Sequence, residues 1–204
     1  MGYVITILMA YLLGCSNMAV YIAKLRKVDL RGSGSGNPGA SNAAILMGWP
    51  AGILVGAHDI GKAYLAVFLA KLLFPDLYGI AEAAGVACVL GHIFPFYLKF
   101  KGGKGFASYL GMTLALNWKF ALIVMAAVVL VTLITDYLVI GTFTTIVAVP
   151  AYVGITGRSW LLAAILGVGT AVIFFKHREN IVRLIKGTEI GLRSTAKGEH
   201  RVKQ

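Results

Sequence analysis

Long apolar runs, separated by short polar segments, follow one another along almost the entire chain. About 20 residues of α-helix are needed to cross the hydrocarbon of a bilayer, and every run except the one at 106–116 approaches that length. The runs cover residues 3–23, 51–74, 79–98, 106–116, 119–134, 138–156 and 160–175. This pattern predicts an all-α integral membrane protein with about seven transmembrane helices in a single domain.

The basic residues are placed at the borders of these runs. Fifteen of the 19 lysines and arginines fall in three clusters, four at Lys24–Arg31, three at Lys99–Lys104 and eight at Lys176–Lys203. Clusters of this kind mark cytoplasmic loops. An even number of crossings must then separate the second cluster from the third, and the four runs between them satisfy this. We therefore expect seven spans, an outside N-terminus and a cytoplasmic basic tail at 176–204; five spans keep the same parity if two later runs are re-entrant or buried.

Composition supports the membrane interpretation. The chain is 58% hydrophobic and only 13% charged, with a mean hydropathy of +0.81. A net charge of +11 could suggest nucleic-acid binding, but the charges border apolar runs, where they suit anionic head groups or phosphorylated substrates. No nucleic-acid partner is expected. Cys15 and Cys88 stand alone inside apolar runs without metal-ligand spacing to any histidine, so neither a metal nor another cofactor is predicted.

Two glycine-rich segments cannot be ordinary helices. The first, at 29–42, has four glycines in eight residues between Gly32 and Gly39, interrupted by Asn37 and Pro38. Glycines allow backbone N–H groups to converge on one point, which suits phosphate oxygens, although a flexible linker is the alternative. The second segment, at 99–105, combines three lysines with three glycines next to His92, and such lysines can also serve only as topology determinants.

Further polar residues are expected on the same side of the membrane. Asp59 and Lys62 lie three residues apart inside an apolar run, where they indicate a polar pocket, a structural ion pair or both. His177, Asn180 and Arg183 share one helical face at the start of the basic tail. Together with the two glycine-rich loops, these residues predict a cytoplasm-facing site for a phosphorylated ligand.

Three segments closely resemble the motifs of the acyl-phosphate:glycerol-3-phosphate acyltransferase family (the PlsY family). They read GSGNPGASN at 34–42, GHIFPFYLKFKGGKGFA at 91–107 and HRENIVRLIKGTE at 177–189, and Asp59 and Lys62 look like the family's D-x-x-K. The resemblance implies a bacterial inner-membrane enzyme whose active site faces the cytoplasm. It would transfer a fatty acyl group from acyl phosphate to the sn-1 hydroxyl of sn-glycerol 3-phosphate, giving lysophosphatidic acid and phosphate. A functional link to the enzyme that makes acyl phosphate is also implied.

The resemblance also assigns roles to residues. Acyl phosphate is already activated, and no convincing Ser-His-Asp arrangement is visible in the sequence, so we expect direct attack by the acceptor hydroxyl. Ser35 would hold phosphate or the reacting oxygen, while His177 and Asn180 would orient the acceptor or polarise the carbonyl. Asp59, Lys62 and Glu189 would support the site. The expected substrate and phosphate ligands are Gly34, Gly36, Asn37, Asn42, His92, Lys101, Gly102, Gly103, Lys104 and Gly105.

One position departs from the family pattern. The family's first motif normally has an arginine three residues after its asparagine, and here Ile45 follows Asn42 at that spacing. An apolar side chain cannot replace a bidentate phosphate ligand, so Arg26 or Arg31 would have to supply the missing charge. The alternatives are a divergent paralogue that acylates or binds another phosphorylated acceptor, and a small organic-phosphate transporter.

Overall fold

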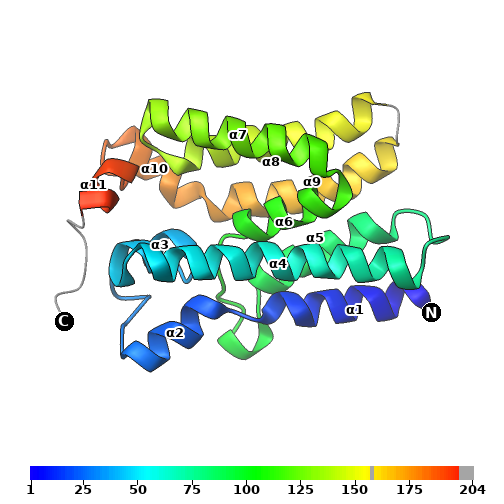
Figure 1. Ribbon diagram of the computed structural model, residues 1–204, viewed down its shortest axis with the longest axis horizontal. Coiled ribbons are helices and arrows are strands. Elements are labelled where there is room, and N and C mark those ends of the chain that lie inside the picture. The colour runs from blue at the N-terminus through cyan, green and yellow to red at the C-terminus, as the bar shows by residue number, and fades with distance from the viewer. Residues whose placement is uncertain (157–158, 198–204) are drawn as a thin grey trace.

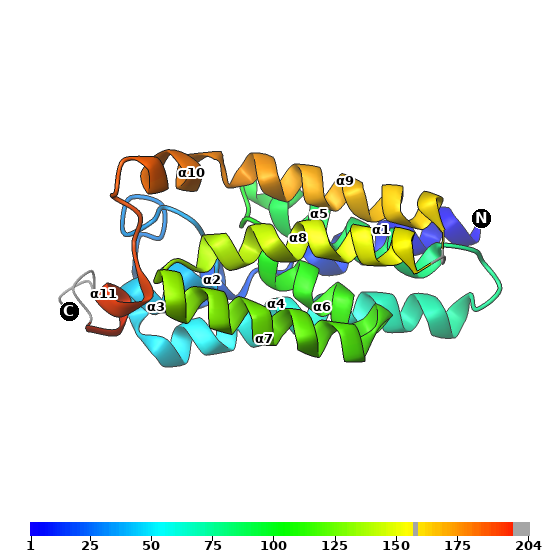
Figure 2. The same cartoon turned by 90° about the horizontal axis from the view of Figure 1, so that it is seen from above.

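The computed structural model describes residues 1–156 and 159–197, and within them the only regular secondary structure is helical (Figure 1). Residues 198–204 of the expected basic tail lie outside the described residues. The N-terminus lies at one end of an elongated bundle, and α2, α3, α10 and α11 gather toward the other (Figures 1 and 2). The helices are α1 (Gly2–Cys15), α2 (Met18–Arg26), α3 (Ala40–Met47), α4 (Trp49–Leu73), α5 (Ile80–Ile93), the 3-10 helix η1 (Phe96–Leu98), α6 (Phe106–Leu116), α7 (Trp118–Thr135), α8 (Leu138–Ile155), α9 (Trp160–Lys176), α10 (Arg178–Ile185) and α11 (Leu192–Lys197).

Each of the seven predicted apolar runs contains a helix. Among the described residues, five helical segments are long and apolar enough to cross a membrane, and a sixth is added if α9 and α10, which are bent by 48°, form one span. The remaining helix, α6, has 11 residues and is about 16 Å long, against about 30 Å of hydrocarbon. The number of crossings therefore stays a prediction.

The first apolar run differs from the single helix expected over 3–23. Helix α1 ends at Cys15 and α2 begins at Met18. Asn17 caps α2, because its Oδ1 accepts from the Val20 amide at 3.1 Å. The carbonyl of Ser16, released by the break, accepts from Lys62 Nζ at 2.6 Å. A lysine buried inside an apolar bundle needs acceptors, and the break supplies one.

The third run also ends earlier than expected. Residues 79–98 were predicted as one span, but α5 ends at Ile93, shortly before Pro95, and η1 follows as a separate turn. The residue before a proline is disfavoured in the α conformation, so the chain leaves the helix there. This early end directs the segment 99–105 back toward the last turn of α5.

Close backbone contact joins α1 to α5. A Cβ at Gly14 would lie 2.1 Å from the Cys88 carbonyl oxygen, and a Cβ at Gly91 would lie 2.1 Å from the Tyr11 carbonyl oxygen. Only glycine fits at either position, and small residues of this kind allow helices to pack tightly in membranes. The contact brings the helix break at Ser16 next to His92.

A polar link inside the apolar core joins three more helices. The Tyr109 ring on α6 is fully buried, and its hydroxyl lies 3.1 Å from Thr170 Oγ1 on α9. Thr170 Oγ1 in turn donates to the Ile146 carbonyl on α8 at 2.7 Å. These contacts fix α6, α8 and α9 around the apolar side of the site.

After α10 the chain crosses the end of the bundle as a segment that we call the C-terminal strap, residues 187–193. Its far end is attached to Asp136, which follows α7. The Leu192 amide donates to the Asp136 carbonyl at 2.8 Å, and the Arg193 amide donates to Asp136 Oδ1 at 2.9 Å. The strap therefore connects α10 to the α7–α8 junction.

Candidate active site

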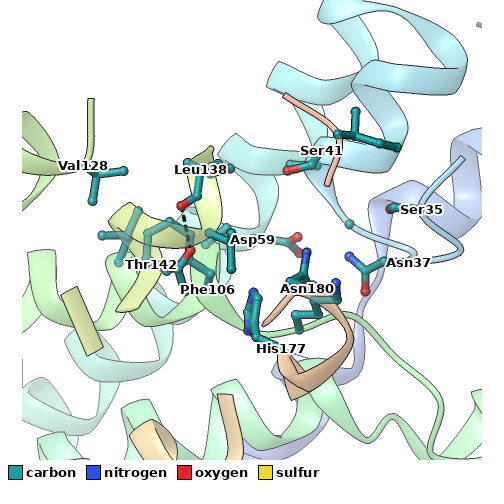
Figure 3. A pocket seen from close by; sticks show the side chains of 18 of the residues that line it. Ser35, Asn37, Ser41, Asp59, Phe106, Val128, Leu138, Thr142, His177 and Asn180 are labelled. Carbon is teal, nitrogen blue, oxygen red and sulfur yellow. Dashed lines mark hydrogen bonds between the residues drawn. The ribbon is translucent and has the colours of Figure 1, made fainter. Parts of the chain in front are cut away.

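A cavity of about 320 Å³ lies where the two glycine-rich loops, α10 and the C-terminal strap meet. Figure 3 shows Ser35, Asn37, His177 and Asn180 on one side of it, and Phe106, Val128, Leu138 and Thr142 on the other, with Asp59 between them. The cavity thus has a polar half built from loops and helix ends, and an apolar half built from α6, α7 and α8. The lining residues used below are Ser35, Asn37, Ile45, Asp59, His92, Lys104, Gly105, Phe106, Leu110, Val128, Leu138, Val139, Thr142, His177, Asn180, Glu189 and Ile190.

Asn42 organises the first glycine-rich loop from within. Its Oδ1 accepts from the Ser35 amide at 2.7 Å, and its Nδ2 donates to the Leu30 carbonyl at 2.9 Å. Gly34 makes the turn between them with φ +61°, and a Cβ there would lie 2.3 Å from Asn42 Oδ1. Asn42 is fully buried and does not line the cavity, so its contribution is to place Ser35 at the cavity wall.

The second glycine-rich loop folds back onto the end of α5. The Gly102 amide donates to the Ile93 carbonyl at 2.9 Å, and the Gly103 amide donates to the His92 carbonyl at 3.1 Å. A Cβ at Gly103 would lie 2.1 Å from His92 Nε2, so only glycine lets the loop approach this ring. The fold-back carries Lys104 and Gly105 into the cavity wall.

Lys104 is one end of a hydrogen-bonded chain that crosses the polar half. Its Nζ donates to Asn180 Oδ1, and Asn180 Nδ2 donates to Glu189 Oε1 at 2.5 Å. The other carboxylate oxygen of Glu189 accepts from Arg183 Nε at 2.7 Å. Burial, reinforced by the nearby Arg183 guanidinium, lowers the pKa of Lys104 to about 8.

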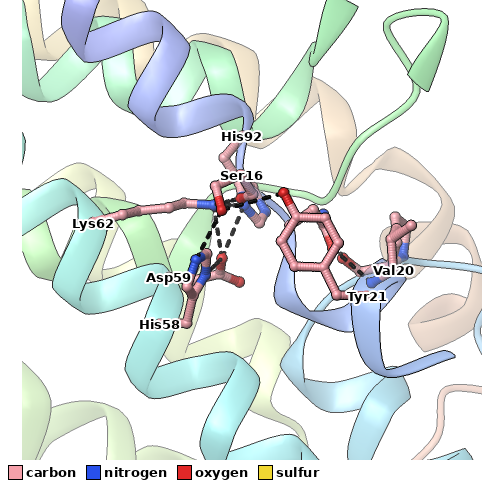
Figure 4. A network of polar contacts seen from close by, with 9 residues as sticks. Ser16, Val20, Tyr21, His58, Asp59, Lys62 and His92 are labelled. Atoms are coloured by element: carbon pink, nitrogen blue, oxygen red, sulfur yellow. Dashed lines mark hydrogen bonds and ion pairs between the residues drawn. The ribbon is translucent and has the colours of Figure 1, made fainter. Parts of the chain in front are cut away.

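A buried ion pair supports the floor of the polar half (Figure 4). Lys62 Nζ lies 2.8 Å from Asp59 Oδ1 and 2.9 Å from His92 Nδ1. All three side chains are at most 5% exposed, and Asp59 and His92 also line the cavity. The two interpretations of Asp59 and Lys62, a polar pocket and a structural ion pair, therefore both hold.

One Ser-His-Asp arrangement, which the sequence did not reveal, does form. Ser16 Oγ lies 3.0 Å from His58 Nε2, and His58 Nδ1 lies 3.4 Å from Asp59 Oδ1. Neither Ser16 nor His58 lines the cavity, and Lys62 makes a closer contact with the Asp59 carboxylate. The group fastens the α1–α2 break to α4 and offers no serine nucleophile to the cavity.

The structure brings nine of the predicted site residues to the cavity wall, and the other seven do not line it. The first group is Ser35, Asn37, Asp59, His92, Lys104, Gly105, His177, Asn180 and Glu189, and the second is Gly34, Gly36, Asn42, Lys62, Lys101, Gly102 and Gly103. The apolar wall was missed, because Val128, Leu138 and Val139 stand in runs that read only as spanning helices. A substrate with an alkyl chain requires an apolar wall, but the sequence does not indicate which residues form it.

Ile45 lines the cavity and is 5% exposed, packed among the apolar residues of α2, α3 and α4. Neither arginine considered as a replacement for the missing charge lies in the wall. Arg26 donates to the Met47 carbonyl at 3.1 Å, and Arg31 donates to the Lys101 carbonyl at 2.5 Å. Lys104 is therefore the only lysine or arginine in the described lining.

The chemistry of the site follows from its two halves. A lysine, side-chain amides and two imidazoles suit a phosphorylated head group and the oxygens of a carbonyl. The wall formed by α6, α7 and α8 suits an alkyl chain. An acyl group could thus be held with its reactive end among the polar groups.

The chain is similar to known proteins over most of its length. The sequence model of the family described as glycerol-3-phosphate acyltransferase matches residues 4–187. A glycerol-3-phosphate acyltransferase of Coxiella burnetii (strain CbuG_Q212) is 42% identical over 191 residues, which are 93% of this chain and 97% of the relative. One from Thermoanaerobacter pseudethanolicus is 38% identical over 190 residues, 91% of this chain and 93% of the relative.

Two solved structures are also similar. The crystal structure of PlsY (YgiH), an integral membrane glycerol 3-phosphate acyltransferase, in its glycerol 3-phosphate form superposes with a TM-score of 0.90 at 32% identity, covering 97% of this chain and 98% of that chain. Its lysophosphatidic acid form gives a TM-score of 0.85 at 32% identity, covering 94% of this chain and 95% of that chain.

Proposed function

The chain belongs to the glycerol-3-phosphate acyltransferase family, and we propose that it acylates glycerol 3-phosphate at the cavity described above with acyl phosphate as the donor. Its acceptor, its acyltransferase activity and its character as a multi-pass membrane protein follow from that membership. The donor, the orientation in the membrane and the roles of individual residues are our proposals.

The division of one cavity into two chemically different halves carries the proposal. The polar half contains the Lys104 cation and the Ser35, Asn37 and Asn180 side chains. The apolar half offers Leu110, Val128 and Val139. A fatty acyl phosphate has the same division, with a phosphate at one end of the reactive carbonyl and an alkyl chain at the other.

The reaction is a direct acyl transfer. The sn-1 hydroxyl oxygen of the acceptor attacks the carbonyl carbon, a new ester C–O bond forms, and the C–O bond to phosphate breaks. The phosphate departs with the electron pair. The proton of the hydroxyl passes either to His177 or to a phosphate oxygen of a substrate, and no acyl-enzyme is needed because the mixed anhydride is already activated.

The residues act mainly by positioning and charge. Lys104 neutralises phosphate, and its position next to Asn180 ties that charge to α10. Ser35, in the first glycine-rich loop, holds an oxygen of the phosphate or the reacting oxygen at the cavity wall. His177 and Asn180 orient the acceptor, and Glu189 fixes Asn180 and Arg183.

The orientation follows from the substrates. Glycerol 3-phosphate is water-soluble, so the site must face the compartment that contains it. The lysine and arginine clusters favour the cytoplasmic side of the bacterial inner membrane. Acyl phosphate is amphiphilic and would enter from the lipid, supplied by the enzyme that makes it.

The direct test uses purified protein in lipid vesicles with palmitoyl phosphate and labelled sn-glycerol 3-phosphate. We expect lysophosphatidic acid and free phosphate in equal amounts, with no product when palmitoyl-CoA or acylated carrier protein replaces palmitoyl phosphate. Product from the thioester donors alone would refute the proposed donor. Acyl label trapped covalently on the protein would refute direct attack.

A change of acceptor is the second candidate function, and Ile45 favours it. An isoleucine in the polar cavity removes a position from which a guanidinium could bind phosphate. If the wild-type protein forms no lysophosphatidic acid but the Ile45→Arg variant does, the wild-type site is specific for a different phosphorylated acceptor. Activity of the wild type would show that the acceptor binds without a guanidinium at position 45, with Lys104 as the cation of the described lining.

A further inference from the structure

The two histidines that line the cavity have different ring nitrogens engaged. His177 Nδ1 lies 2.8 Å from the Ile173 carbonyl oxygen. A carbonyl oxygen can only accept, so Nδ1 of His177 carries the proton. In the neutral ring, Nε2 is then the nitrogen with the free electron pair.

His92 has the opposite arrangement. Lys62 Nζ has three partners, the Ser16 carbonyl oxygen at 2.6 Å, Asp59 Oδ1 at 2.8 Å and His92 Nδ1 at 2.9 Å. Three acceptors match the three N–H groups of an ammonium, which has no electron pair to offer. Nδ1 of His92 must therefore accept, and the proton of the neutral ring resides on Nε2.

The contact between His92 and Asp59 agrees with this assignment. His92 Nδ1 lies 3.3 Å from Asp59 Oδ1, a longer distance than either atom makes to Lys62 Nζ. Both atoms accept from the same ammonium, which holds them near one another without a proton between them. If Lys62 were absent, the same geometry would let Nδ1 donate to Asp59.

Nε2 of His92 lies at the second glycine-rich loop. A Cβ at Gly103 would be 2.1 Å from this atom, which places it against the loop backbone, and His92 lines the cavity. No described residue forms a hydrogen bond with Nε2 of His92. The nitrogen is thus a donor without a protein acceptor, beside the loop that carries Lys104.

We propose that Lys62 holds His92 in the Nε2–H tautomer, so that His92 donates a hydrogen bond to a substrate oxygen while His177 presents an unprotonated Nε2 to the same cavity. Lys62 is a positioning residue, since it acts through His92. The inference rests on the proposed function only for the identity of the oxygen, which belongs to the phosphate or the carbonyl of the acyl donor. One histidine donates and the other accepts, so the two are not interchangeable.

The tautomers can be measured without activity. The chain has four histidines, so 15N spectra of histidine-labelled protein in lipid nanodiscs are simple, and loss of one ring in a His92→Gln sample assigns the signal. At pH 7 we expect an unprotonated Nδ1 and a protonated Nε2 for His92, with the reverse for His177. A protonated Nδ1 on His92 overturns the inference.

Three substitutions of the Lys62 and His92 side chains extend the test. In Lys62→Met we expect the His92 proton to move to Nδ1, where Asp59 accepts it. In the His92→Gln variant, the side-chain amide nitrogen can occupy the position of the histidine Nε2. In His92→Asn, the shorter side chain places its amide at the position of Nδ1. We expect kcat/KM within about tenfold of wild type for His92→Gln, and a loss of about 100-fold or more for His92→Asn. If His92→Asn retains as much activity as His92→Gln, the donor role is wrong.

The outcomes also separate this inference from the proposed function. An active enzyme whose His92 carries the proton on Nδ1 overturns the inference and leaves the function intact. The expected spectrum in a protein that transfers no acyl group supports the tautomer assignment and overturns the function.

Discussion

Lys104 donates to the amide oxygen of Asn180, 76 residues further along the chain. Because Asn180 in turn donates to Glu189, the amide group is fixed in one orientation with both of its ends occupied. An ammonium has three N–H groups, and Asn180 accepts from one of them, so the others can bind a substrate phosphate. The contact with Asn180 therefore orients the cation toward the cavity without using up its donors.

Removal of the Lys104 charge should weaken phosphate binding. Hydrogen bonds to charged groups contribute about 1.5–3 kcal/mol, so Lys104→Met should lower kcat/KM for glycerol 3-phosphate by about 10- to 100-fold. Lys99→Met is the matched control, since Lys99 is exposed in the same loop and does not line the cavity. Equal losses in the two variants would contradict the assignment of Lys104.

The pKa of Lys104 predicts an alkaline limb in the pH profile. Only the protonated amine attracts phosphate, and the pKa is lowered to about 8, so kcat/KM should fall as the pH rises through 8. A phosphate monoester loses its second proton near pH 6, so the substrate does not change charge in this range. Lys104→Arg should move the limb upward, because a guanidinium stays charged. A profile that is flat to pH 10 would exclude this titration.

Asn42 should matter for activity although it does not line the cavity. Asn42→Ala removes the acceptor for the Ser35 amide and leaves the Leu30 carbonyl without its partner, at a cost of about 1–3 kcal/mol in the free energy of unfolding. Asn42→Asp keeps the acceptor for the Ser35 amide but sets a carboxylate oxygen against the Leu30 and Ser33 carbonyls, so it should lower the free energy of unfolding as well. Ser35→Ala provides the comparison, and undiminished turnover in that variant would refute the role of the hydroxyl.

The apolar half should select for acyl-chain length. Val128 lines the cavity from α7 and is 6% exposed, so Val128→Phe should fill part of the space that a long chain occupies. We expect kcat/KM for a sixteen-carbon acyl phosphate to fall more than that for an eight-carbon one. Ile123→Phe on the same helix is the control, because Ile123 is 67% exposed. An unchanged ratio of the two donors in Val128→Phe would place the alkyl chain elsewhere.

Attachment of the C-terminal strap should affect the site at a distance. Asp136→Ala removes the acceptor for the Arg193 amide, whereas Asp136→Asn keeps it. Glu189 and Ile190 lie in the strap and line the cavity, so loosening it should raise KM for the acceptor several-fold and speed amide hydrogen exchange at 187–193. Exchange and kinetics that are unchanged in Asp136→Ala would show that the Asp136 side chain does not hold the strap, since the backbone bond from Leu192 remains in this variant.

The hydropathy pattern predicted the long helices well, because residues that contact lipid must be apolar and their backbone must be hydrogen-bonded within the helix. Residues 119–134 were expected as a span, and α7 runs from Trp118 to Thr135. The break at Ser16 was not predicted, since the sequence continues apolar through Met18–Ile22 and the freed Ser16 carbonyl finds its partner in a lysine 46 residues away.

The polar half of the site could be predicted and the apolar half could not. A loop with four glycines, a lysine between glycines and a histidine at the end of an apolar run are unusual beside spanning helices, so Ser35, Lys104 and His177 stood out. Val128 and Ile123 are both aliphatic residues of α7, yet one lines the cavity and the other is exposed. Only the packing of α6 and α8 against α7 separates them.

The glycine-mediated contact between α1 and α5 has a consequence for how the protein is made. The Tyr11 hydroxyl on α1 donates to the Phe94 carbonyl, 83 residues further along the chain. At about 5–20 residues per second, roughly 4 to 17 seconds pass between the synthesis of Tyr11 and the synthesis of Phe94. Biogenesis thus leaves the first helix in lipid with the backbone at Gly14 uncovered until α5 is inserted beside it.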